Sequence, residues 1–121
     1  ADVLTHAVMD AILGALGEGD IGKHFPDTAQ VFKDISSLVL LDRVFTLMRD
    51  KGYRIGNIDC IIVAQKPKLA PYIDQMRAKL SEVLACEMAQ INIKATTTER
   101  LGFEGLEQGI SSQAIVMLIN Q

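Results

Sequence analysis

The sequence predicts an α/β (α+β) fold in which helices pack on one face of a small mixed β-sheet. The chain has 121 residues, of which 49% are hydrophobic and 22% charged, as expected of one compact globular domain over residues 1–121. Segments with helical spacing of apolar residues alternate with short segments rich in β-branched residues. The predicted order is helix, loop, helix, strand, helix, strand, loop, strand, which favours a two-layer sandwich.

Three segments carry apolar residues at helical spacing, so each is predicted to be an amphipathic helix. The first covers residues 3–16 and the second residues 36–51, where Gly52 after a lysine is typical of a helix end. The third covers residues 71–86, with Pro71 at the helix start that proline tolerates.

Three further segments are predicted to be strands. Residues 53–65 hold a nearly continuous apolar run, which indicates a strand buried at the centre of the sheet. Residues 91–97 alternate apolar with polar side chains, as in a half-exposed strand, and residues 114–119 form a last apolar strand. The glycine-containing segments 17–27 and 102–109 are predicted to be irregular loops.

Charge and cysteine content exclude several classes of protein. The formal net charge is −3, so sequence-independent electrostatic binding to nucleic acid is not expected. No stretch reaches the roughly 18 apolar residues of a membrane span, and no secretory signal is recognisable. Cys60 and Cys86 lie in apolar runs, so we expect no disulfide. Because Ala1 opens directly into a helical pattern, we expect an N-terminal segment with further strands to precede it.

The first predicted helix carries a candidate metal-binding stripe. Asp2, His6 and Asp10 are four residues apart and so project from one side of the helix. A neutral imidazole is a common transition-metal ligand, and a carboxylate one turn away can orient it. A single histidine is more often a hydrogen-bonded structural residue. Catalytic zinc needs three protein ligands, so the others would have to come from elsewhere.

Two loops offer groups for a phosphorylated ligand. Residues 20–27 combine glycine amides, a lysine and two carboxylates, which suit a hydroxylated or phosphorylated molecule, or a solvated connection capped by Asp27. Residues 64–68 join a strand end to a proline-containing loop with two lysines. That loop would suit a nucleotide phosphate, or an ordinary exposed turn. His24 is predicted to lie on a surface loop.

Residues 95–100 are the most unusual stretch of the chain. Three consecutive threonines at a strand end can direct hydroxyl and N–H groups at phosphate oxygens, and Glu99 could hold a divalent cation that bridges them. The alternative is a helix capping box, because Thr96 and Glu99 have the required spacing.

Taken in order, these segments resemble the 2-C-methyl-D-erythritol 2,4-cyclodiphosphate synthase family of the non-mevalonate isoprenoid pathway. The resemblance covers essentially the whole chain. The segments that carry it are Asp20-Ile21-Gly22-Lys23, Phe25-Pro26-Asp27-Thr28, Gly52-Tyr53, Gly56-Asn57-Ile58-Asp59, Ala64-Gln65, Pro67-Lys68, Lys94-Ala95-Thr96-Thr97-Thr98-Glu99 and Leu101-Gly102-Phe103.

This resemblance implies a ferredoxin-like subunit, a homotrimer with active sites at the subunit interfaces, and two metal ions, one Zn2+ and one Mg2+ or Mn2+. It implies a phosphorus–oxygen lyase reaction. The 2-phosphate of 4-diphosphocytidyl-2-C-methyl-D-erythritol 2-phosphate attacks its diphosphate, which releases CMP and closes the cyclic diphosphate without a protein nucleophile. Metal ions and fixed N–H groups would offset the repulsion between phosphates.

The resemblance also assigns roles to residues. His6 would be a zinc ligand with Asp10 as its hydrogen-bonding partner, Glu99 would bind the second metal, and Thr97 would stabilise the transition state. The residues it places on the substrate are Asp20, Ile21, Gly22, Phe25, Pro26, Asp27, Thr28, Ala29, Ala64, Gln65, Lys66, Pro67, Lys68, Leu69, Ala70, Thr96, Thr97, Thr98, Glu99 and Phe103.

Two features depart from the family pattern. The family's Asp-x-His zinc motif and its His-Ser pair would lie before Ala1, and Leu106 stands where the family often has an arginine. The first departure keeps open a non-catalytic trimer that binds cytidine nucleotides or isoprenoid diphosphates. A ferredoxin-like regulatory domain with coincidental loop matches is the third hypothesis. The expected location is the bacterial cytoplasm, with a plastid-type organelle as the alternative.

Overall fold

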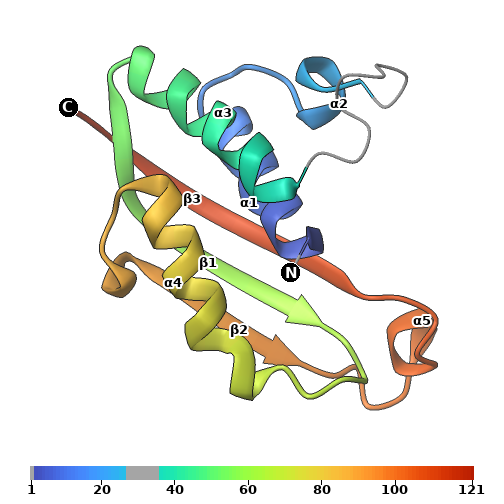
Figure 1. The fold of residues 1–121 in the computed structure, drawn as a ribbon. Coiled ribbons are helices and arrows are strands. Elements are labelled where there is room, and N and C mark those ends of the chain that lie inside the picture. Colours follow the sequence, from blue (N-terminus) through green and yellow to red (C-terminus); the bar gives the residue numbers. More distant parts are fainter. Residues whose placement is uncertain (1, 27–35) are drawn as a thin grey trace.

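The computed structural model describes residues 2–26 and 36–121. Figure 1 shows how the helices and strands are arranged. Along the chain they are α1 (Asp2–Ala15), α2 (Ile21–His24), α3 (Ser37–Asp50), β1 (Tyr53–Val63), the 3-10 helix η2 (Ala70–Tyr72), α4 (Ile73–Leu84), the 3-10 helix η3 (Met88–Gln90), β2 (Ile91–Thr96), α5 (Gly102–Gly105) and β3 (Ser111–Asn120).

The described strands form one mixed sheet in the order β2-β1-β3. β1 is parallel to β2 and antiparallel to β3, with Asp59 opposite Asn92 on one side and Ile115 on the other. The three long helices α1, α3 and α4 cover the same face of this sheet (Figure 1). The predicted mixed sheet with helices on one face is therefore confirmed, and the apolar run of β1 has the central place that it indicated.

The hydrophobic core lies between the helices and the sheet. α1 contributes a fully buried stripe, and β1 turns alternate side chains toward the helices because successive strand residues face opposite sides. The largest side chains that are almost completely buried are Leu4, Met9, Ile12, Leu13, Leu41, Met48, Ile58, Leu84 and Ile91.

The helix that was predicted from Pro71 to Cys86 is shorter in the structure. Residues 70–72 form a 3-10 turn, and α4 begins at Ile73. At the other end Ala85 is left-handed, with a φ of 52°, and its N–H donates to the carbonyl oxygen of Ser81. This left-handed residue ends the helix before Cys86.

The segments 17–27 and 102–109 were predicted to be irregular loops, but each contains one short helix. Asp20 caps α2 by accepting a hydrogen bond from the N–H of Lys23 at 3.0 Å. His24 ends this helix, and its Nε2 lies 2.6 Å from the carbonyl oxygen of Glu18, so it is not a free surface side chain. β3 is also longer than the predicted residues 114–119.

The face of the sheet away from the helices, here called the open face, carries exposed apolar side chains on β3. Ile115 is 76% and Met117 63% exposed. Asp59 lies beside them and binds Lys94 at 2.9 Å and Asn92 at 3.0 Å. These two contacts hold the pKa of the Asp59 carboxyl below its usual value. Large exposed apolar side chains at this spacing are typical of a surface that a protein partner covers.

Among the described residues, no helix is long and apolar enough to cross a membrane. Both cysteines are free thiols, as expected, and Cys60 lies in the core. Burial raises the pKa of the Cys60 thiol to about 11, so it is a neutral core side chain at physiological pH.

Candidate active site

The loops that follow β1 and β2 lie side by side because the two strands are parallel and end at the same edge of the sheet. Val63 at the end of β1 is opposite Thr96 at the end of β2. The pairing continues one residue further, since the N–H of Ala64 donates to the carbonyl oxygen of Thr96 at 3.0 Å. Residues 64–70 and 95–97, which are about 30 positions apart in sequence, therefore form two walls of one site.

A cavity of about 180 Å³, here called the cleft, opens between these walls. Its apolar side chains can contact a base or sugar, while Lys68 and the threonines offer a charge and hydroxyl groups to phosphate. Lys68 is exposed and forms no ion pair among the residues that the structure describes. The lining residues are Ala64, Gln65, Pro67, Lys68, Leu69, Ala70, Ala95, Thr96 and Thr97.

Residues 96–100, here called the threonine loop, form a tight turn. The N–H of Glu99 donates to Oγ1 of Thr97 at 3.3 Å, and Oγ1 of Thr98 donates to the carbonyl oxygen of Leu101. No helix begins at residues 96–99, and α5 begins only at Gly102. The capping-box alternative for Thr96 and Glu99 is therefore wrong, because the next helix has Leu101 as its N-cap.

Four of the predicted substrate residues on this side do not line the cleft. Thr98 and Glu99 lie farther along the threonine loop, and Phe103 is a half-exposed residue of α5. Lys66 instead lines a neighbouring cavity of about 330 Å³, together with Gln65, Arg100 and Leu106, and pairs with Glu107 at 3.6 Å.

The predicted residues of the α2 segment lie against α1. Oδ1 of Asp10 accepts a hydrogen bond from the N–H of Ile21 at 3.0 Å. Asp10 thus fixes the start of α2, and Asp20 caps the same helix. Phe25 packs against the core, and Pro26 is exposed. The predicted residues Asp27, Thr28 and Ala29 lie outside the described residues.

His6 is an exposed residue of α1 whose Nε2 lies 3.3 Å from Oγ of Ser37. Ser37 was not singled out from the sequence, because 31 positions separate it from His6. In the described part of the chain, no group of three or more His, Cys, Asp or Glu side chains could hold a metal ion. One imidazole fits zinc as a single ligand, so these residues do not complete a zinc site by themselves.

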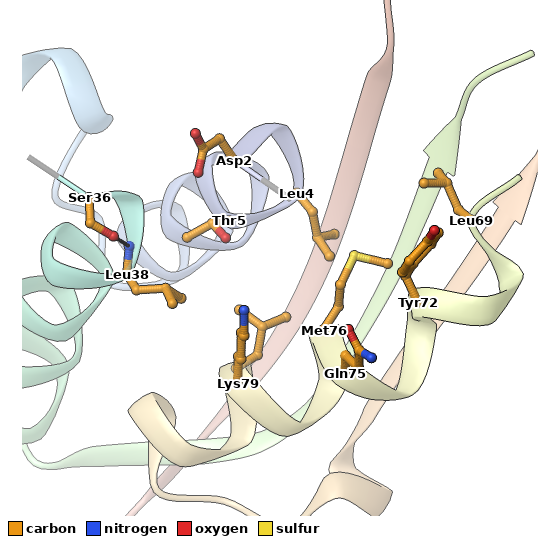
Figure 2. Close-up of a pocket in the computed structure, with 11 residues that line it drawn as sticks. Asp2, Leu4, Thr5, Ser36, Leu38, Leu69, Tyr72, Gln75, Met76 and Lys79 are labelled. Carbon is orange, nitrogen blue, oxygen red and sulfur yellow. Dashed lines mark hydrogen bonds between the residues drawn. The ribbon is translucent and has the colours of Figure 1, made fainter. Parts of the chain in front are cut away.

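The predicted site residues thus form two groups that lie apart in this chain. Figure 1 shows α2 beside α1, apart from α5 and from the ends of β1 and β2. A second cavity, of about 420 Å³, lies between the first turns of α1 and α3 and the segment η2–α4. Figure 2 shows the residues that line it. Of the predicted substrate residues, only Leu69 lines it.

Comparison with known proteins gives consistent matches over nearly the whole chain. The model of the YgbB family matches residues 1–119. The 2-C-methyl-D-erythritol 2,4-cyclodiphosphate synthase of Desulfitobacterium hafniense is 63% identical over 119 residues, which are 98% of this chain and 75% of the relative. The synthase of Halalkalibacterium halodurans is 60% identical over 119 residues, 98% of this chain and 76% of the relative.

Solved structures show the same fold. The bifunctional IspDF of Campylobacter jejuni superposes with a TM-score of 0.94 at 41% identity, covering 98% of this chain and 32% of that one. Plasmodium falciparum IspF in complex with CDP gives a TM-score of 0.87 at 34% identity, covering 98% and 71%. The chain therefore belongs to the YgbB family, the 2-C-methyl-D-erythritol 2,4-cyclodiphosphate synthases of isoprenoid biosynthesis.

Proposed function

We propose that this single synthase domain converts 4-diphosphocytidyl-2-C-methyl-D-erythritol 2-phosphate into 2-C-methyl-D-erythritol 2,4-cyclodiphosphate and CMP, as a phosphorus–oxygen lyase. The observation that carries the proposal is the cleft, in which Lys68 and the threonines meet an apolar wall. A solved structure of a relative that is 34% identical is a complex with CDP, which has the nucleoside and diphosphate that such a cleft would accept. Its bacterial relatives favour a cytoplasmic location.

The reaction needs two phosphate groups of like charge to meet. An oxygen of the 2-phosphate attacks the phosphorus of the diphosphate nearer the erythritol and forms a new P–O–P bridge. The bond from that phosphorus to the bridging oxygen of CMP breaks, and CMP leaves with the electron pair. Lys68 would attract the phosphate of the cytidine end by charge, and the Thr97 hydroxyl would donate to a phosphate oxygen as charge builds on it.

Metal ions remain part of the proposal. Glu99 is exposed, and its carboxylate has no hydrogen bond or ion pair with the other described residues, so it suits a hard cation such as Mg2+ or Mn2+. His6 would give one ligand to Zn2+, with the remaining donors outside the described residues. When bound, these ions would neutralise phosphate charge.

A homotrimer would explain two observations. The open face presents Ile115, Met117 and Ile119 to solvent, and a neighbouring copy would bury them. The two groups of predicted site residues lie apart within one protomer, and a site at a subunit interface would join them. The substitution Ile115→Asp is therefore expected to give monomers, as measured by sedimentation. The helical circular-dichroism spectrum should stay unchanged.

The function is tested by measuring CMP release from 4-diphosphocytidyl-2-C-methyl-D-erythritol 2-phosphate, with and without a chelator. Calorimetric titration with CDP measures binding separately. Lys68→Met is expected to weaken CDP binding about ten-fold, as for loss of a charged hydrogen bond. Lys79→Met, a cation on α4 outside the cleft, serves as the matched control. Chelator-sensitive CMP release supports the synthase.

The cleft would also serve one competing function, a non-catalytic trimer that binds cytidine nucleotides or isoprenoid diphosphates. CDP binding without CMP release from a metal-loaded trimer would establish that function instead.

A further inference from the structure

The threonine loop has an unusual backbone. Glu99 and Arg100 are consecutive residues with positive φ values of 56° and 67°. This left-handed region is disfavoured for side chains with a Cβ, so neighbouring groups must hold two such residues in a row. The conformation matters to the cleft because Thr96 and Thr97, which line it, belong to the same loop.

The groups that hold the loop come from three parts of the chain. Thr97 and Thr98 provide local hydrogen bonds within the turn. Gly105 packs directly on Arg100, since a Cβ at Gly105 would lie 2.1 Å from the carbonyl carbon of Arg100. The contact from farthest away in sequence is that of Gln65, whose Oε1 accepts the N–H of Arg100 at 3.2 Å.

Gln65 stands between the two cavities at this end of the sheet. It lines both the cleft and the neighbouring cavity that contains Arg100 and Leu106. The residue before it, Ala64, is held at the strand ends, because its N–H donates to the carbonyl oxygen of Thr96. The acceptor oxygen of Gln65 is already used by the Arg100 N–H, so this oxygen does not need a ligand to satisfy it.

We propose that Gln65 is a positioning residue, which braces the threonine loop across the cleft so that Thr97 faces the phosphates of the ligand. This role rests on the proposed function and replaces a direct contact between the Gln65 carbonyl oxygen and the nucleotide. Loss of the Gln65–Arg100 hydrogen bond lowers the affinity for ligands whose phosphates reach the threonine loop. It leaves unchanged the affinity for a nucleoside that contacts only the wall of residues 64–70.

The test compares cytidine with CDP by calorimetric titration of the full assembled protein. Gln65→Met keeps the length of the side chain but removes the acceptor oxygen. We expect CDP affinity to fall about three- to ten-fold and cytidine affinity to stay within two-fold of wild type, since one hydrogen bond is lost. Gln75→Ala, an exposed glutamine on α4 that does not line the cleft, is the matched control. An equal loss for cytidine and CDP would overturn the proposal.

A double-mutant cycle separates bracing from contact. Arg100→Gly relieves the left-handed backbone, because glycine adopts positive φ readily. In that background Gln65→Met should weaken CDP binding less than two-fold, whereas a direct contact would cost the same in both backgrounds. Amide exchange of Arg100, followed by NMR, should quicken in Gln65→Met. If wild-type protein binds neither cytidine nor CDP, the proposed function fails, and unchanged exchange of the Arg100 amide would separately refute the brace.

Discussion

Gly105 provides the most direct test of how tightly α5 and the threonine loop pack. A Cβ added there would lie 2.1, 2.5 and 2.8 Å from the C, Cα and O atoms of Arg100. All three are backbone atoms, so a change of side-chain rotamer cannot relieve the contact. Reaching an ordinary separation of 3.4 Å requires the two segments to part by about 1.3 Å. Gly105→Ala is therefore expected to destabilise the fold by about 1–3 kcal/mol, as overpacking does.

Urea denaturation followed by circular dichroism measures this loss, which corresponds to a fall in Tm of roughly 3–5 °C per kcal/mol. CDP affinity should fall as well, because Arg100 must move and carries the threonine loop with it. Gly14→Ala is the control. Gly14 lies in α1 with nothing within 4 Å of the added Cβ, so alanine should stabilise the helix by about 0.5–1 kcal/mol. Wild-type stability and CDP affinity in Gly105→Ala would refute the packing described here.

Three other outcomes are expected. Leu41→Ala removes a completely buried α3 side chain and should cost about 2–5 kcal/mol of unfolding free energy, with the slope of the urea transition unchanged. Because Lys94 and Asn92 lower the pKa of Asp59, its ionised form stabilises the fold above the ordinary aspartate pKa, and this stability disappears as the pH falls through the lower folded pKa. Thermal unfolding below about pH 4 should show a smaller acid-induced loss in Asp59→Asn than in wild type; equal slopes would contradict this. The thiol of Cys60, with a pKa of about 11, should react with a thiol reagent at neutral pH far more slowly in native than in urea-unfolded protein, and Cys86 should react first.

The main elements of the fold were predictable because their signals are local. The apolar run of β1 indicated a central strand, and the apolar spacing of α1 and α3 indicated helices that cover the sheet. The short helices α2 and α5 were not predicted, since four residues are too few to show a helical period. Their ends depend on contacts such as that of Asp10 with Ile21, which are not visible in the pattern.

The site was predictable only in part. Lys68 and Thr97 were singled out, and the structure places both on one cleft. The contacts of Gln65 with Arg100 and of His6 with Ser37 join residues more than 30 positions apart, and no periodicity signals such pairs. The left-handed backbone at Glu99 and Arg100 was also hidden, because glycine and asparagine are the usual signals of that conformation.

The apolar sequence of β3 affects the risk of aggregation while the protein is being synthesised. Its residues 114–119 are an uncharged apolar run with high β-propensity, and among the described strands it pairs with β1 alone. Such a segment favours cross-β aggregation while its apolar side chains Ile115 and Met117 remain exposed. In the proposed trimer, association of the open face competes with aggregation for the same strand. Slow association of protomers during synthesis would then lower the yield of folded protein.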